Sequence, residues 1–266
     1  MRRGHLFWGS LLLVLGVLFL LDNLGYLPVG AWALIGPLFL VALGLWVLGG
    51  VWYRQRVRGP AEVIVPLEGA RRGALRVRHG AGRLAIGAGA IGDTFLSGSG
   101  GGLQWRARRE GELLEVDLYF GRGEAAFSPW GWGRQGPFDW SLSLNGNVPL
   151  TLEVESGADE TSLDLRDLQV AELHVQSGAS STRVTLPAVA GHTRACIRVG
   201  AAAVDVRVPE GVAASIRVRG ALAGISVDAK RFPPLDGDTY RSPDYEMAAH
   251  RAEIDIEAGV GAVSVR

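Results

Sequence analysis

A repeat of about 20 residues limits the folds that the second half of this chain can adopt. The pattern Leu152-x-Val154-x-Ser-Gly-Ala returns 21 residues later as Leu173-x-Val175-x-Ser-Gly-Ala. Each unit contains two short alternations of apolar and polar residues, which is the period of a strand with one buried face. One glycine separates the two alternations of each unit, at intervals of 21, 22 and 20 residues and then 39: Gly157, Gly178, Gly200, Gly220 and Gly259.

Such a unit cannot bury an apolar face alone, whereas stacked units can bury their faces against one another. Glycine at each break permits the positive φ or the close backbone approach that a sharp corner needs. The sequence therefore predicts an all-β fold, a single-domain β-solenoid or roll of about 20-residue repeats. Val, Ile and Leu point inward, and Glu, Asp, Arg and Thr point outward. A twisted β-sandwich is the alternative, because the repeat is degenerate.

Three segments lie outside the simple repeat. Residues 103–120 predict a hairpin that turns at Glu110-Gly111, and the prolines of residues 230–250 suit a loop covering the open edge of the solenoid. Residues 121–140 are rich in glycine and aromatic residues. They are interpreted either as an irregular loop packed beside the β domain or as a contact with a membrane surface or a partner. That contact would use Phe127, Trp130, Trp132 and Phe138.

The N-terminal part of the chain predicts a transmembrane helical hairpin over residues 1–58, with spans at about 6–24 and 31–53. The second span is uncharged and long enough to cross about 30 Å of hydrocarbon. The first is shorter and needs its flanking residues to complete a span. Pro37 and the glycines of this region are tolerated between membrane helices.

The basic residues beside the hairpin predict its orientation. The connecting loop carries only Asp22, whereas arginines lie on both outer sides: Arg2, Arg3, Arg54, Arg56 and Arg58. Under the positive-inside rule, both termini lie in the cytoplasm. A cleaved signal peptide is the alternative interpretation of the first span. It leaves residues 54–266 on the same side, because the second span would stop their transfer.

The arginines continue beyond the hairpin into residues 59–72, which we assign to a juxtamembrane basic linker before a β-repeat domain at 73–266. Basic residues near anionic lipid contribute about 1 kcal/mol each to membrane binding. The candidate membrane-surface contacts are therefore Arg54, Arg56, Arg58, Arg71 and Arg72. The alternative is that these residues determine topology and lie on a solvated strand face.

Enzymatic chemistry is not indicated. The charge is balanced at 27 basic and 27 acidic residues, so no overall field favours nucleic acid, and a single cysteine excludes CxxC sites. GxGxxG occurs at 87–92 and 131–136 without a helix to follow, and no Walker motif or GxSxG elbow is present. We predict no cofactor, metal or small-molecule substrate. The alternative is a pair of catalytic carboxylates, as in a glycosidase, or a metal site. Either would use Asp159, Glu160, Asp164 and Asp167.

Two parts of the chain resemble known bacterial families. "RRGHLFWGSLLLVLGVLFLLDNLGYLP" resembles the LiaI/LiaF-like transmembrane region of envelope proteins. "LRVRHGAGRLAIGAGA", "NVPLTLEVESGADETSLDLRDLQVAELHVQSGASSTRVTLP" and "IEAGVGAVSV" resemble the toast-rack and LiaF C-terminal type of β-repeat domain. One departure is that two spans are readable here, whereas LiaF-type proteins often have more. The resemblance implies a bacterial protein without enzymatic activity, and some members restrain a sensor histidine kinase in the cell-wall stress response.

The expected function is therefore a non-enzymatic, membrane-anchored regulator or scaffold of the bacterial envelope, located in the inner membrane. Its expected partners are the lipid bilayer and either a membrane sensor kinase or further copies of itself, with no nucleic acid. The alternative is a structural membrane-associated scaffold that self-assembles through the edges of its β-repeats.

Overall fold

A computed structural model describes residues 61–120 and 138–266 of the chain. The predicted spans at 6–24 and 31–53 lie outside the described residues. Within these described ranges, no helix is long and apolar enough to cross a membrane. All the regular elements there are strands, which confirms the predicted all-β fold.

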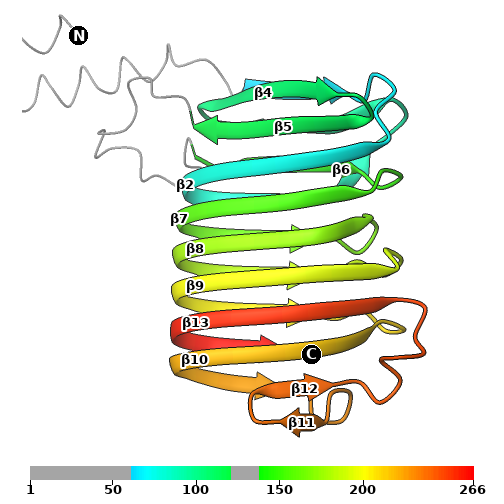
Figure 1. Cartoon of the computed structure of the whole chain (residues 1–266). Helices are drawn as coiled ribbons and strands as arrows, with labels where there is room; N and C mark the ends of the chain where they lie inside the picture. The colour runs from blue at the N-terminus through cyan, green and yellow to red at the C-terminus, as the bar shows by residue number, and fades with distance from the viewer. Residues whose placement is uncertain (1–60, 121–137) are drawn as a thin grey trace, which may run out of the picture. The chain divides into compact units, whose positions relative to one another are not determined.

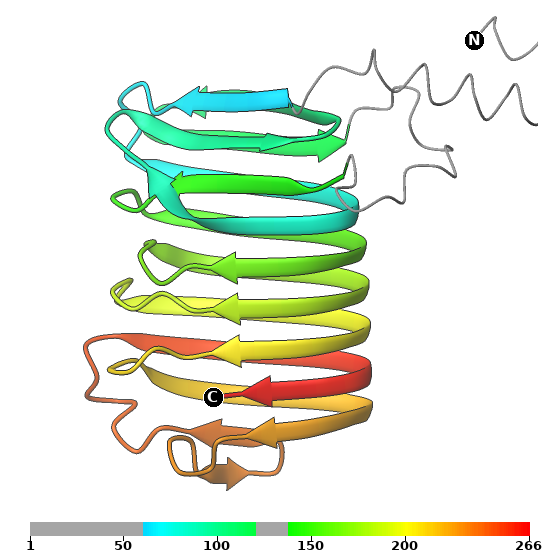
Figure 2. The ribbon, with the colours of Figure 1, turned by 180° about the vertical axis from the view of Figure 1, so that it is seen from behind.

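Six long strands build the body of the domain, and each one bends in its middle and returns on the opposite side (Figures 1 and 2). We call the halves before the bend the first layer and the halves after it the second layer. The apolar alternation on either side of the bend puts Val, Leu and Ile of both layers into one core between them. The long strands are β2 (Arg72–Ala90), β7 (Leu150–Asp164), β8 (Val170–Thr185), β9 (His192–Arg207), β10 (Ala213–Val227) and β13 (Arg251–Val265).

The long strands pair in parallel along both layers, in the spatial order β2, β7, β8, β9, β13 and β10. The C-terminal strand β13 therefore lies between β9 and β10 rather than after β10. The stacking of neighbouring units that the repeat predicts is present, but its order departs from the order of the chain. Since every long strand carries the same apolar alternation, sequence pattern alone does not distinguish the two orders.

Shorter strands extend each layer beyond the long ones. At the β2 end, β5 (Leu113–Phe120) and β4 (Leu103–Glu110) extend the first layer. The predicted hairpin of residues 103–120 is thereby confirmed. The second layer is extended at the same end by β6 (Trp140–Asn145), β3 (Thr94–Gly100) and β1 (Ala61–Pro66). Strand β1 lies within the predicted basic linker at residues 59–72. Its single Val63-x-Val65 alternation, buried against the core, is too short to be recognised as a strand by pattern.

At the other end, residues 230–250 form β11 (Pro234–Asp236) and β12 (Thr239–Arg241). Strand β12 pairs antiparallel with Ser215–Arg217 of β10, and β11 pairs with β12. The prediction that this segment covers an edge is therefore correct for the first layer of β10. It does not hold for the second layer, where no strand of the described residues pairs with the outer edge.

Glycines line the bend, where they stack on one another from strand to strand. A Cβ added to Gly157 would lie 2.5 Å from the carbonyl oxygen of Gly80, and one added to Gly178 would lie 2.9 Å from that of Gly157. Gly200 and Gly259 repeat the arrangement, at 2.7 Å and 2.5 Å from the preceding carbonyl. These four glycines do not have positive φ. The repeated glycine is therefore required by close approach of neighbouring backbones and not by a left-handed conformation.

Candidate functional site

The predicted membrane contacts are only partly described. Arg54, Arg56 and Arg58 lie outside the described residues. Arg71 and Arg72 stand at the start of β2, where both side chains are exposed and both backbone N–H groups donate to the carbonyl of Glu112. The Arg71 guanidinium also pairs with the Glu112 carboxylate, at 3.4 Å between NH1 and Oε1. These two residues face solvent, and their contact with lipid stays a prediction.

Of the predicted partner loop, Phe127, Trp130 and Trp132 lie outside the described residues. Phe138 is half-buried, and its ring packs on Phe120 with 5.3 Å between ring centroids. Its carbonyl accepts a hydrogen bond from Nε2 of His79 at 2.7 Å. Phe138 therefore packs at the bend, and a partner contact through this loop, with Phe138 and the other three aromatic residues, stays a prediction.

The outer face of the first layer is a regular array of charge, and it is the strongest candidate for a functional surface. Cross-strand registers place its side chains in three columns that run across the strands. Acidic and basic residues largely alternate along each column, because neighbouring strands carry opposite charges at matching positions. One column comprises Arg106, Asp117, Arg76, Glu153, His174, Cys196, Asp255 and Arg217.

Ion pairs connect the strands at this face. Arg194 Nε lies 3.3 Å from Glu253 Oε2, and Arg198 Nε lies 3.2 Å from Glu257 Oε2. Arg219 bridges Asp255 and Glu257, at 3.1 Å and 3.2 Å. All these side chains remain at least about a third exposed, so their charges stay available to a partner. Such exposed pairs contribute little to folding, at roughly 0–1 kcal/mol each.

Towards the β2 end of the same face, Arg76 pairs with Glu153 at 2.7 Å. The hydrogen bond from Arg76 to Glu153, together with the negative charge of that carboxylate, raises the pKa of Arg76 above its ordinary value. Nearby, the Tyr119 ring lies beneath the guanidinium groups of Arg78 and Arg106, at 5.9 Å and 5.3 Å from the ring centroid. Tyr119 and these two arginines line a groove of about 640 Å³.

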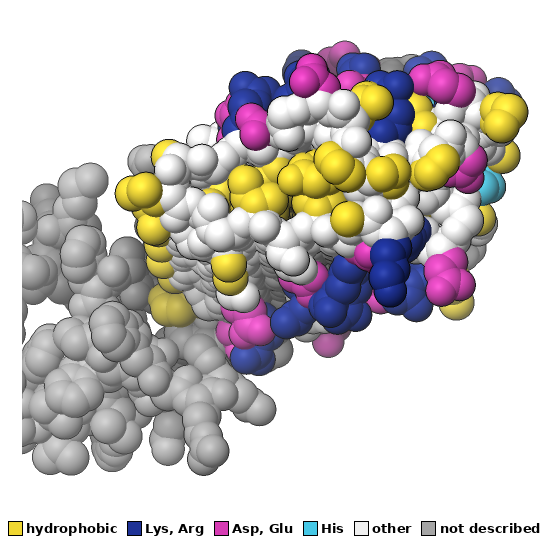
Figure 3. Space-filling model, turned by 90° about the horizontal axis from the view of Figure 1, so that it is seen from below, with side chains coloured by type: hydrophobic (Ala, Val, Ile, Leu, Met, Phe, Trp, Pro, Cys, Tyr) yellow, Lys and Arg dark blue, Asp and Glu magenta, His cyan; other side chains and the backbone are white. Residues whose placement is uncertain are grey.

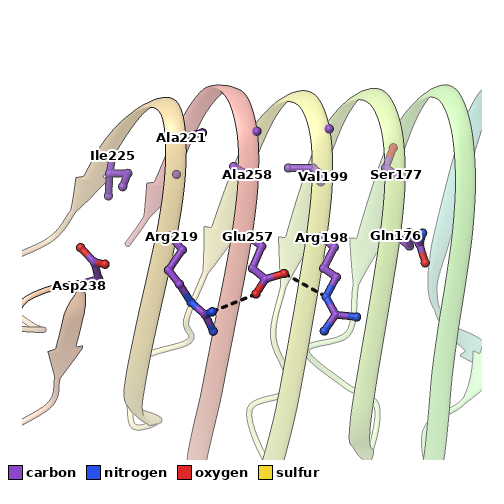
Figure 4. A pocket seen from close by; sticks show the side chains of 13 residues that line it. Gln176, Ser177, Arg198, Val199, Arg219, Ala221, Ile225, Asp238, Glu257 and Ala258 are labelled. Atoms are coloured by element: carbon purple, nitrogen blue, oxygen red, sulfur yellow. Dashed lines mark hydrogen bonds and ion pairs between the residues drawn. The ribbon is translucent and has the colours of Figure 1, made fainter.

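A second groove, of about 570 Å³, crosses β8, β9, β13 and β10 near the bend. Figure 4 shows Arg219, Glu257, Arg198 and Gln176 in a row on the outer side of these strands, with Val199 and Ala258 close to the bend. The dashed lines mark the ion pairs that join Glu257 to both arginines. Arg198, Glu257 and Arg219 are neighbours only because β13 lies between β9 and β10. The sequence pattern does not reveal this strand order, so the row could not be predicted from it.

The acidic residues proposed as an alternative catalytic or metal site do not converge. Asp159 is buried at the inner side of the bend, where Oδ2 lies 3.1 Å from Nδ1 of His79 and accepts a hydrogen bond from Thr161. Glu160 faces solvent and pairs with Arg83, while Asp164 is exposed at the end of β7 and accepts a hydrogen bond from the backbone of Arg166. Across the described ranges, no group of three or more His, Cys, Asp and Glu side chains could hold a metal ion.

The buried His79–Asp159 contact was not recognised from the sequence. His79 carries no metal-site spacing to other histidines, and its partner lies 80 positions away. The His79 ring also packs edge-on against Trp140, at 5.0 Å between centroids. This polar group joins β2, β7 and the chain before β6, so it holds the bend together at the β2 end.

Comparisons with known proteins agree with this architecture. Residues 55–207 match the family model described as the N-terminal domain of toast_rack, DUF2154. A crystal structure from Clostridium sporogenes ATCC 15579, described as a "putative cell adhesion protein", is similar with a TM-score of 0.69 and 20% sequence identity. The match covers 78% of this chain and 99% of that one. The comparison with curated proteins gave no match. Because the family model covers more than half of the chain, this protein belongs to the toast-rack (DUF2154) family.

Proposed function

We propose that this protein is a non-enzymatic, membrane-anchored regulator or scaffold of the bacterial envelope, which binds a protein partner through the charged outer face of its first layer. The observation that carries the proposal is the alternation of exposed acidic and basic side chains across the parallel strands β2, β7, β8, β9, β13 and β10. A rigid array of this kind supports recognition of a complementary charged surface, because opposed charges fix the register and accelerate the encounter.

The partner that we propose is a membrane sensor histidine kinase. This step rests on the resemblance of the N-terminal region to LiaI/LiaF-like proteins and on the two predicted spans, which would place the β domain beside a membrane partner. The proposed topology puts residues 61–266 in the cytoplasm. A role in adhesion, the one that the description of the Clostridium sporogenes protein names, would instead require the β domain outside the cell. The topology therefore decides between these two functions.

The topology is tested with a C-terminal tag on the full chain, by protease treatment of inside-out and right-side-out vesicles. Digestion in inside-out vesicles alone supports the regulatory role. Digestion from the outside excludes a cytoplasmic kinase-binding domain and favours a role at the cell wall.

The charged face is tested by crosslinking in cells, with Glu253→Lys and Glu257→Lys combined in one variant. Glu160→Lys is the matched control, because Glu160 is an exposed, arginine-paired glutamate on the second layer. We expect the native chain and the control to recover a sensor kinase, and the double variant to lose it. Equal recovery of the kinase with the double variant would contradict the role of this face.

A further inference from the structure

The end of the solenoid at β10 is uneven. The first layer continues past β10 with β12 and β11, whereas the second layer stops at β10. Within the described residues, the second half of β10 pairs with β13 along one edge and with nothing along the other. We call this unpaired edge, residues 222–227, together with the overhanging β12, the end ledge.

The backbone groups of the ledge are oriented for pairing. Asp228 N donates to the carbonyl of Val265 on β13. Because successive residues of a strand direct their N–H and C=O groups to opposite sides, those of Ile225 and Val227 are directed away from β13. These two residues therefore present free donors and acceptors at the open edge.

The apolar side chains at the ledge occupy positions that are buried in the other long strands, but here no neighbouring strand of the described residues covers them. Ile225 occupies the same register position as Val263 and Val204, which are 1% and 2% exposed, yet Ile225 is 40% exposed. The half-buried side chains of Ala223, Val227 and Tyr240 pack against the core beside it. Figure 3, which views this end, shows a band of hydrophobic side chains crossing it between two charged rims.

The other outer edges of the two layers are protected. Strand β1 carries Glu62 and ends at Pro66, and β4 carries three arginines and a glutamate among its eight residues. The third of these edges, β11, begins with Pro234 and ends with Asp236. Charges and proline are the ordinary protection of an edge strand against pairing. Residues 220–227, "GALAGISV", contain neither. The ledge is therefore the one outer edge among the described strands that is left open in this way.

A second copy of this chain does not fit the ledge. Antiparallel pairing of two β10 edges about a two-fold axis would join the second layers of the two copies into one sheet. Both first layers would then lie on the same side of that sheet. The two edges would then lie about 4.8 Å apart, while β12 and β11 of each copy project two strands past its own β10. Because β12 pairs with Ser215–Arg217, opposite the middle of the ledge, the two overhangs would collide.

We propose that the end ledge binds one extended segment of a partner protein, which adds to the second layer as a strand parallel to β10. The inference deepens the proposed function and rests on it, since it assigns a docking surface to the partner. The added strand would bury Ile225 and use the free backbone groups of Ile225 and Val227, as in strand addition to other sheet edges. Alternate apolar side chains of the segment would meet the core, and the others would face solvent.

The charge of Asp238, near the bend, determines which kind of side chain the beginning of that segment should carry. Asp238 lines the groove together with Ile225 and Gly220. Arg219 is already held by Asp255 and Glu257, and Asp238 has no ion pair within the described ranges. The ledge therefore favours a Lys or Arg where the added strand begins, beside the bend.

The probe is a fluorescent peptide that copies residues 257–266, with Lys in place of Glu257. Strand β13 already pairs with β10 in parallel register, and the strands of a solenoid are related by translation, so this sequence also matches the open edge. Binding is measured by anisotropy with the full chain in detergent micelles. We expect saturable binding, weaker binding of the peptide that keeps Glu257, and loss of that difference in the Asp238→Asn variant.

Two variants locate the site. Ile225→Lys puts a charge at the ledge and should weaken binding by about tenfold or more. Ile64→Lys makes the same change at an exposed isoleucine of β1, at the opposite end of the second layer, and should leave binding unchanged. Circular dichroism confirms that both variants fold.

Three outcomes would overturn the inference: no saturable binding up to about 1 mM peptide, equal binding by the Ile225→Lys variant, or a dimer of the native chain that Ile225→Lys dissociates. The last would assign the ledge to a second copy. The peptide assay needs no kinase, and its variants leave Glu253 and Glu257 of the charged face unchanged. It can therefore fail while the crosslinking experiment succeeds, and the reverse also holds.

Discussion

The carbonyl oxygen of Gly80 lies 2.5 Å from the position that a Cβ on Gly157 would occupy. This contact is the first of a stack that continues through Gly178, Gly200 and Gly259. It explains why the repeat keeps a glycine at each bend, and it gives the first prediction a matched pair of variants.

Gly157→Ala is expected to destabilise the domain by about 1–3 kcal/mol, because the added methyl group must displace the backbone of the neighbouring strand. Gly80→Ala is the control, since a Cβ at Gly80 has no atom within 4 Å and the backbone there does not have positive φ. Its effect should be within about 1 kcal/mol, and a slight stabilisation is compatible with it. Urea denaturation of both variants measures the change in the free energy of unfolding. Equal losses of this free energy in the two variants would contradict a role for close backbone stacking.

Asp159→Ala is expected to cost about 1–3 kcal/mol of unfolding free energy, because it leaves buried His79 and Thr161 without their shared acceptor. Glu160→Ala, one residue away and exposed, should cost no more than about 1 kcal/mol. Thermal unfolding of the two variants distinguishes them. If the costs are similar, the buried polar group does not stabilise the bend.

Glu257→Ala is expected to change stability by less than about 1 kcal/mol, although Glu257 pairs with both Arg198 and Arg219. All three side chains are exposed, so water and salt screen their charges. A double-mutant cycle with Arg198→Ala measures the coupling. A coupling well above about 1 kcal/mol would mean that the charged face serves the fold rather than a partner.

Removal of residues 251–266 is expected to unfold more than one strand. Because β13 lies between β9 and β10, its loss exposes both neighbouring edges and separates β10 from the rest of the sheet. Hydrogen exchange should show loss of protection in β10 as well as weakened protection in β9. Retained protection of β10 would show that it can pair directly with β9 in the order of the chain.

High pH should weaken the domain through Tyr245. Burial, followed by the negative charge of Glu253, raises the pKa of Tyr245 above its ordinary value of 10.0. The unfolded chain therefore ionises first, so stability falls as the pH rises above about 10. Tyr245→Phe should reduce this slope in denaturation curves measured between about pH 9 and pH 11, and an unchanged slope would assign it to other groups.

The sequence by itself determined the local structure of the β domain. Its apolar alternation specifies which side of each strand is buried, as at Leu152 and Val154, and this depends only on the two-residue period of a strand. The regular spacing of the glycines likewise predicted the bend, and Glu110-Gly111 predicted the hairpin turn, because such signals lie within a few residues of one another.

Only the tertiary structure decided which strands are neighbours. The insertion of β13 between β9 and β10 brings Glu257 to Arg198 and Arg219, and the stacking of β2 on β7 brings His79 to Asp159. It also leaves Ile225 at an end with no covering strand among the described residues, although its alternation is that of a buried position. Repeats of nearly equal pattern pair about equally well in any order, so the arrangement is set by the connections and by packing at the two ends.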